Sequence, residues 1–225
     1  MRDLLDTAKC VLLVLEGPVC RLFSPTARRE LATALDDLVR AAGHPPLARE
    51  DPYETLRAAL AEPTLRRDGT ADQVAAAVER AEHAAAPLAF PAPYSDTLLH
   101  TLVATGRRPA VVTDVGEEAA ARYLDGRRLG HLLAGHLHGR RGTGPLMPHP
   151  GCVARALEAA GVHAADALLV GGTPKALEAA EAAGVPFLGC ARGDEEREAL
   201  TAAGAERSAA SLREVVQAID PGAHV

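Results

Sequence analysis

Short runs of consecutive apolar residues recur along this chain, and they limit its possible folds more than any other feature of the sequence. The first run covers residues 10–15 and is followed by Glu16 and Gly17. Further runs lie at residues 110–113, 167–171 and 186–190, with a weaker one within residues 131–137. Strands that are buried on both faces, as in parallel sheets, have such continuous runs, whereas half-exposed strands alternate apolar and polar residues. The runs therefore predict a buried parallel sheet.

The segments between these runs carry the start and stop signals of helices. Thr173 followed by Pro174 offers an N-cap and a proline at the first helical position, and Gly184 is typical of the end of such a helix. Further helices are predicted at residues 152–160 and 212–219. Alternating strands and helices are typical of a parallel sheet that helices cover on both faces. We therefore predict an α/β fold with a Rossmann-like core.

Residues 23–93 interrupt this alternation. The segment has no strand candidate, and its helix starts are Ser24-Pro25, Asp51-Pro52 and Thr70, which forms a capping box with Gln73. We therefore predict an all-helical subdomain at residues 23–93, inserted into an α/β core formed by residues 1–22 and 94–225. This insertion either packs on itself as a small bundle or forms a lid over the ends of the strands.

Composition and charge exclude several classes of protein. The chain of 225 residues has 30 acidic and 24 basic side chains, and the basic ones are scattered instead of forming the clustered face that binds nucleic acid. It has no apolar run of membrane-spanning length, and its first residues lack the pattern of a signal peptide. We therefore expect no nucleic-acid or membrane partner and a cytoplasmic location. The four cysteines form no CxxC pair, so the sequence suggests neither a zinc knuckle nor a redox motif.

Four segments of the chain, taken in order, resemble the motifs of one superfamily of enzymes. They are the strand and acid-Gly turn at residues 10–17, the strand at 109–113, the proline-rich segment at 146–150 and the strand and helix start at 167–174. Together with the helical insertion, they are similar to the haloacid dehalogenase-like (HAD) hydrolases, in the helical-cap branch of the phosphoglycolate phosphatase-like members. The resemblance covers almost the whole chain and implies a parallel-sheet core with an inserted helical cap.

The catalytic positions of this resemblance carry the wrong residue types for phosphatase chemistry. The two aspartates that the family places at the end of its first strand, a nucleophile and an acid/base, correspond to Val14 and Glu16. The family's lysine corresponds to Met147, and its metal-binding acids correspond to Gly172 and Ala176. A valine side chain cannot form an aspartyl-phosphate, and one glutamate is a poor site for magnesium. We therefore predict that phosphatase activity is lost and that no metal or other cofactor is bound.

A smaller set of polar residues could still hold a ligand. Glu16, Thr113, Asp114, Thr173 and Lys175 lie at or just after the predicted strand ends. The first amide groups of the helix at Thr173 could bind an anion, because a helix N-terminus offers unpaired donors and a positive partial charge. The alternative is that Thr113 only ends a strand, Thr173 only caps a helix, Asp114 is a turn residue and Lys175 is solvated.

The histidines do not form a recognisable metal site. His136 and His138 would share one face of a strand, and a His-x-His pair can bind zinc. A third ligand at a suitable spacing is missing from the sequence. We therefore expect no metal ion at these residues.

Two functional hypotheses follow. The first is a pseudoenzyme with the HAD fold that acts by binding, either to a partner protein or to a small anionic ligand; homodimer formation stays open. The second is a working hydrolase that uses an unusual set of residues, Glu16, Asp114 and His149. Only this second hypothesis requires magnesium. Open α/β sheets place their sites at the carboxyl ends of the strands, so both hypotheses expect Val14, Glu16, Thr113, Met147 and Gly172 to lie together.

Overall fold

The structure is a computed structural model that describes residues 1–222, and a parallel sheet forms its centre. Within these residues the main sheet has six strands in the order β5-β4-β1-β6-β7-β8, and every neighbouring pair is parallel. The strands are β1 (Cys10–Val14), β4 (Arg108–Gly116), β5 (Leu137–Arg140), β6 (Ala167–Gly171), β7 (Phe187–Cys190) and β8 (Ser208–Ala209). The predicted parallel α/β fold is confirmed.

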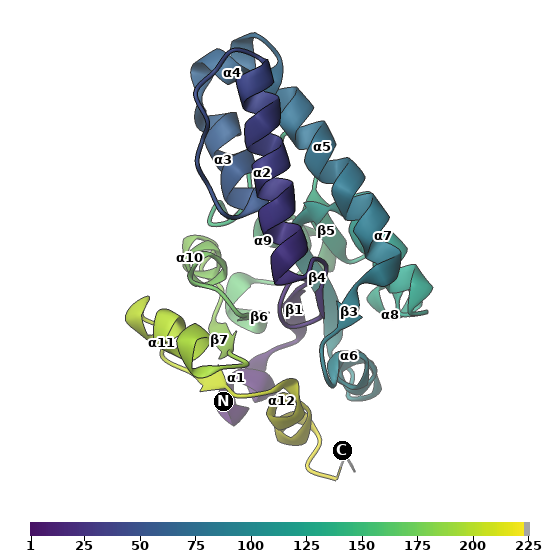
Figure 1. The fold of residues 1–225 in the computed structure, drawn as a ribbon. Helices are drawn as coiled ribbons and strands as arrows, with labels where there is room; N and C mark the ends of the chain where they lie inside the picture. The colour runs from purple at the N-terminus through teal and green to yellow at the C-terminus, as the bar shows by residue number, and fades with distance from the viewer. Residues whose placement is uncertain (223–225) are drawn as a thin grey trace.

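Helices cover both faces of this sheet (Figure 1). One face packs against α1 (Arg2–Thr7), α6 (Ser95–Ala104) and α12 (Leu212–Ile219), and the other against α9 (Gly151–Ala160) and α10 (Pro174–Ala182). The remaining helices of this part are α7 (Glu117–Gly126), α8 (Gly130–Leu133), α11 (Asp194–Ala202) and the 3-10 turn η2 (Ala164–Asp166). Successive side chains of β1 point to opposite faces, so Leu13 joins the first apolar layer and Leu12 and Val14 join the second.

The helical insertion lies above the carboxyl ends of the strands, at the top of Figure 1. We use this name for α2 (Pro25–Ala41), α3 (Pro52–Ala61), α4 (Pro63–Arg67) and α5 (Thr70–Ala85). The turn η1 (Ala86–Leu88) and a two-stranded antiparallel sheet, β2 (Cys20–Arg21) with β3 (Phe90–Pro91), connect the insertion to the core. Residues 24–93 contribute no strand to the main sheet within the described chain, as the helical interpretation predicted. The segment is not all-helical, however, because Phe90–Pro91 form β3 and pair with β2 where the chain returns to the core.

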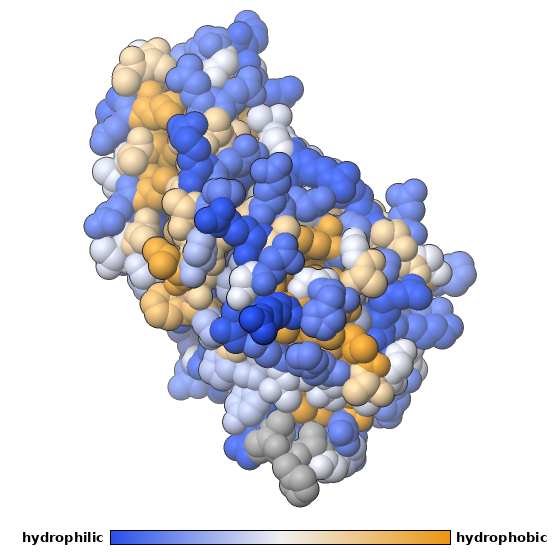
Figure 2. Space-filling view, turned by 90° about the vertical axis from the view of Figure 1, so that its right-hand side faces the viewer, coloured by the Kyte–Doolittle hydropathy of each residue, from blue (hydrophilic) through white to orange (hydrophobic). Residues whose placement is uncertain are grey.

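The surface is mostly hydrophilic on the side that lies to the right in Figure 1, and its hydrophobic side chains form separate patches (Figure 2). Within residues 1–222, no helix combines the length and the apolar character needed to cross a membrane.

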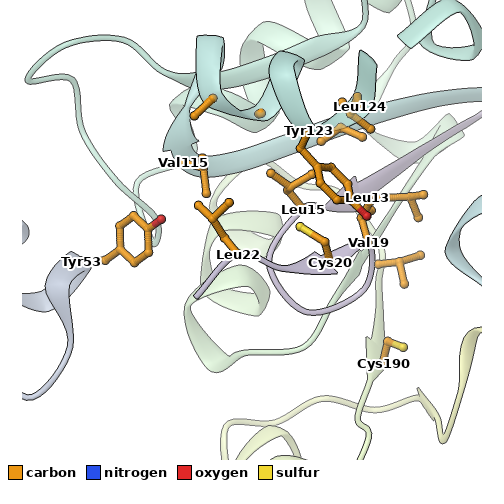
Figure 3. Packing of buried hydrophobic residues seen from close by; sticks show 14 of the residues in the cluster. Leu13, Leu15, Val19, Cys20, Leu22, Tyr53, Val115, Tyr123, Leu124 and Cys190 are labelled. Atoms are coloured by element: carbon orange, nitrogen blue, oxygen red, sulfur yellow. The ribbon is translucent and has the colours of Figure 1, made fainter. Parts of the chain in front are cut away.

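One apolar cluster runs without interruption from the core into the helical insertion. It joins Leu13 and Val115 of the core to Tyr53, Leu56 and other buried residues of the insertion. Figure 3 shows the Tyr53 ring directed toward Val115 and Leu22 at the edge of the core part of this cluster. The insertion therefore buries apolar surface against the core as well as within itself, which stabilises their relative position.

Two local predictions were wrong. Residues 131–137 form no single strand, because α8 covers the first part, Ala134 and Gly135 have positive φ, and β5 begins only at Leu137. Short apolar runs of this kind do not distinguish a helix from a strand. Thr70 is the first helical residue, not the N-cap. Gly69 is the N-cap, and the Asp68 side chain accepts the Thr70 N–H.

Candidate functional site

A cavity of about 250 Å³ lies between the carboxyl ends of the strands and the helical insertion. Its lining combines predicted and unpredicted residues: Val14, Glu16, Arg28, Asp51, Tyr53, Glu54, Arg57, Thr113, Asp114, Val115, Met147, Thr173 and Lys175. The structure thus brings together Val14, Glu16, Thr113 and Met147. Gly172 lines a neighbouring cavity, together with Glu16 and Thr173. His149 is exposed and lines neither of these two cavities.

The floor of the cavity is part of an apolar layer of the core. Val14 and Met147 line the cavity, whereas Ala176 does not. The three residues are 6%, 4% and 1% exposed, and all belong to one buried cluster with Leu12 and Val112. These are the positions at which the resemblance implies an aspartate, a lysine and a second aspartate. Their side chains pack as ordinary core residues, so this part of the site has no group that could attack, coordinate or neutralise a phosphate.

The backbone near Gly172 leaves little room for an acidic side chain. A Cβ atom at this position would lie 3.2 Å from the carbonyl oxygen of Cys190. That distance is short for a carbon–oxygen contact, so an aspartate at position 172 would require the Cys190 carbonyl to shift by a few tenths of an ångström.

Glu16 has both carboxylate oxygens engaged within the protein. Oε1 accepts the Leu22 N–H at 2.7 Å, which closes the turn after β1. Oε2 forms an ion pair with Arg28 of α2. The glutamate therefore joins the core to the helical insertion.

Arg28 has a second acidic partner in Asp51, the N-cap of α3. Arg28 Nε donates to Asp51 Oδ2 at 2.8 Å, while Asp51 Oδ1 accepts the N–H groups of Tyr53 and Glu54. Burial alone would lower the pKa of Arg28, but the carboxylates of Glu16 and Asp51 raise it above its ordinary value. The arginine is therefore held as a cation by two acidic side chains.

Asp114, at the end of β4, links the strand to the segment around Met147. Its Oδ1 accepts the Met147 N–H at 2.7 Å, and its Oδ2 lies 3.5 Å from Nη2 of Arg57. The same Arg57 nitrogen donates to the Met147 carbonyl oxygen at 2.7 Å. Burial raises the pKa of Asp114 to about 6, although the Met147 N–H and the Arg57 charge oppose this change.

Lys175 is paired with the helical insertion. Its ammonium forms an ion pair with Glu54 of α3, which also lies 2.9 Å from Arg57 Nη1. Partial burial would raise the pKa of Glu54, but the hydrogen bond from Lys175 and the charge of Arg57 lower it below its ordinary value.

The two threonines accept hydrogen bonds from nearby backbone groups. The Thr113 hydroxyl accepts the Val115 N–H at 3.0 Å, and the Thr173 hydroxyl accepts the Ala176 N–H at 3.3 Å as the predicted N-cap of α10. Each hydroxyl retains its own proton for donation to another group.

The histidines are separate from this cavity. The rings of His136 and His138 have centroids 6.5 Å apart, and burial lowers the pKa of both. No group of three or more His, Cys, Asp or Glu side chains in residues 1–222 is arranged to hold a metal ion.

Sequence patterns did not reveal the residues that the insertion contributes to the cavity. Arg28, Asp51, Tyr53, Glu54 and Arg57 come from helices whose charged residues look solvent-exposed when the sequence is considered alone. Of these residues, only Asp51 was recognised from the sequence as a position with a role, and that role was the start of a helix, not part of a site.

Comparisons with known proteins give the fold. No protein-family model matches the sequence, and no curated protein matches it either. Among solved structures, a predicted phosphatase from Clostridium acetobutylicum aligns with a TM-score of 0.69 at 15% identity, covering 94% of this chain and 98% of that one. A putative phosphoglycolate phosphatase from Lactobacillus plantarum aligns with a TM-score of 0.69 at 16% identity, covering 94% of this chain and 99% of that one. A haloacid dehalogenase-like protein of unknown function from Agrobacterium tumefaciens aligns with a TM-score of 0.61 at 15% identity, covering 95% of this chain and 98% of that one.

Proposed function

We propose that this protein, which has the fold of the HAD hydrolases, has no phosphatase activity and acts by binding. The observation that carries the proposal is the burial of Val14, Met147 and Ala176 in one apolar cluster at the carboxyl ends of the strands. A phosphatase of the resembled type needs a carboxylate nucleophile, a cation and metal ligands at these positions. Apolar side chains supply none of these groups.

The remaining acidic residues do not fit a magnesium site. Magnesium prefers octahedral oxygen ligation, usually from one or two carboxylates together with substrate phosphate. Glu16 already binds Leu22 N–H and Arg28, and Asp114 already binds Met147 N–H and lies near Arg57. A magnesium ion would have to displace these contacts, so we derive no step through a metal.

The charges of the cavity favour a protein partner over a small anion. Among its described lining residues, the three cations Arg28, Arg57 and Lys175 are each paired with one or more of four carboxylates. These carboxylates are Glu16, Asp51, Glu54 and Asp114. A phosphate would therefore meet no excess of positive charge. A small anion remains the second candidate, because the hydroxyl protons of Thr113 and Thr173 and the partly exposed Lys175 could still donate to it.

An active hydrolase has one observation in its favour. The raised pKa of Asp114 is a kind of perturbation that catalytic acids and bases also show. Burial accounts for this pKa without a catalytic role, and His149, the proposed third member, does not line the cavity. The geometry therefore favours the non-catalytic proposal.

A phosphatase assay tests the proposal. We expect the purified protein not to hydrolyse p-nitrophenyl phosphate with magnesium at any pH from acid to mildly alkaline. Phosphate monoester hydrolysis requires more than ~20 kcal/mol of barrier lowering, which hydroxyl and amide groups alone cannot supply. Turnover that survives re-purification and disappears in Glu16→Gln would establish the hydrolase instead. Calorimetric titration with inorganic phosphate distinguishes the two binding candidates, because binding that is weakened in Lys175→Met would support the small anion.

A further inference from the structure

Arg140 of β5 is a fully buried cation that contacts both the core and the helical insertion. Its side chain is 0% exposed, and Nη2 lies 2.8 Å from Oε2 of Glu82, which is also 0% exposed. Glu82 belongs to α5 of the insertion. The Arg140 guanidinium also donates to the core carbonyl oxygens of Asp114, at 3.1 Å, and Gly142, at 2.8 Å. One side chain thus binds both the end of β4 and helix α5 of the insertion.

Glu82 strengthens this connection with a second bond to the core. Its Oε2 accepts the N–H of Gly116, the last residue of β4, at 3.0 Å. Burial raises the pKa of Glu82, while the Arg140 charge and the Gly116 N–H oppose that rise. If the two elements separated, the carboxylate would lose both of its core partners together.

Arg57 provides a second connection between the insertion and the same end of β4. It extends from α3 to the Met147 carbonyl oxygen and lies close to the Asp114 carboxylate. Asp114 is therefore contacted through its backbone by Arg140 and through its side chain by Arg57. We call Arg57, Glu82, Asp114, Arg140 and Met147 the Asp114 network.

We propose that the Asp114 network fixes the helical insertion on the core in one closed position, so that the resting protein does not open its cavity. Helix α5 is bound to the end of β4 through Glu82, and α3 is bound to Met147 and Asp114 through Arg57. The shared apolar cluster includes residues of both helices and of the core. If the insertion rotated about the Arg57 contact, the Glu82 contact would break, and a rotation about the Glu82 contact would break that of Arg57. Opening would also expose apolar residues that the insertion and the core bury jointly, including Tyr53 and Val115.

This inference does not depend on whether the protein hydrolyses phosphate esters. A closed resting state could belong to a binding protein or to an enzyme that waits for an activating partner. The experiments below measure the position of the insertion directly, so their outcome is separate from that of the phosphatase assay.

Hydrogen exchange of the unmodified protein gives the first test. The Gly116 N–H donates to Glu82, so any opening that separates α5 from the core exposes this amide. We expect Gly116 to exchange within about tenfold of the slowest amides of β1, because only global unfolding should release it. Exchange that is faster than β1 by several hundredfold, without loss of the β1 protection, would overturn the proposal.

Distance measurement between two spin labels gives the second test. Ala34→Cys on α2 and Glu178→Cys on α10 are exposed positions, whereas the four native cysteines are buried and should not be labelled. We expect one narrow distance distribution in the otherwise unmodified chain. Glu82→Gln combined with Arg140→Met removes both charges, and adding Arg57→Met removes the second contact. We expect this triple variant to gain a second population at a different distance.

A matched control removes an ion pair that lies wholly within the core. Lys9→Met breaks the contact of Lys9 with Asp166, 3.1 Å long, and should leave the distance distribution unchanged. A broad distribution in the otherwise unmodified labelled chain would show that the insertion is already mobile and would overturn the proposal. A triple variant that folds, by circular dichroism, and keeps the narrow distribution would also overturn it. If the triple variant does not fold, the Gly116 exchange measurement decides.

Discussion

Arg28 of the helical insertion forms an ion pair with Glu16, which is the acidic residue that remains from the motif after β1. The pair lines the cavity and connects α2 to the turn that follows the strand. A residue that resembles a catalytic acid/base by its position is thus a structural contact in this protein.

Glu16→Gln should lower the free energy of unfolding by about 1–2 kcal/mol. The amide oxygen can still accept the Leu22 N–H, but the ion pair with the partly buried Arg28 is lost, and Asp51 remains as its acidic partner. Urea unfolding measures the change. The control is Asp37→Asn, which breaks an exposed pair with Arg40 and should cost less than about 0.5 kcal/mol. Equal effects of the two substitutions would contradict a structural role for Glu16.

Val14→Asp should destabilise the protein by about 3 kcal/mol or more at pH 7, because an unpaired carboxylate would enter the apolar cluster of Leu12 and Met147. Burial would raise the pKa of the new carboxyl, so the cost should shrink as the pH falls and the group takes up a proton. The near-isosteric Val14→Thr is the uncharged control and should show no such pH dependence. We also expect no phosphatase activity from Val14→Asp, since catalytic groups that act as a unit do not function singly.

Asp114→Asn should become more stable relative to the unmodified protein as the pH rises from about 4 to about 7. The folded-state pKa of Asp114 is raised to about 6, so in this range the folded protein binds more protons at this residue than the unfolded chain does. Its contribution to the free energy of unfolding therefore decreases with rising pH and levels off above the folded pKa. The asparagine has no such dependence and can still accept the Met147 N–H. Urea unfolding at several pH values measures the difference in unfolding free energy between Asp114→Asn and the unmodified protein. We expect this difference to change by up to about 3 kcal/mol across the range, and a difference that stays constant with pH would contradict the raised pKa.

Removal of one partner from the Glu82–Arg140 pair should cost more than removal of both. Arg140→Met alone leaves the fully buried Glu82 without its cation and should destabilise the protein by about 3–5 kcal/mol. Combining it with Glu82→Gln removes the uncompensated charge, so the double variant should recover part of that loss. A double-mutant cycle of urea unfolding measures the coupling. Additive losses would show that the two side chains contribute independently, against the paired arrangement.

The sequence by itself determined the α/β fold and the edge of the sheet at which the motif residues meet. Continuous apolar runs such as residues 10–15 require burial on both faces, and Glu16 and Thr113 mark where two such runs end. Parallel strands bring their carboxyl ends to the same edge of a sheet, so the sequence predicts that these two residues lie at one edge. The N-cap at Thr173 could also be predicted from the sequence, because its hydrogen bond with the Ala176 N–H lies within a single helical turn.

Only the tertiary structure decided what those residues contact. Arg28, Arg57 and Glu54 reach the strand ends because the insertion folds back over the sheet, and no local pattern encodes that approach. Lys175 lies far from Glu54 in the sequence, and Asp114 lies far from Arg57, so these two ion pairs form only after the chain has packed. The same holds for Arg140 and Glu82, whose burial results from the contact of α5 with the core. The position of each strand follows from local hydrophobicity, whereas the order of the strands and the charge pairing across the cavity depend on the complete fold.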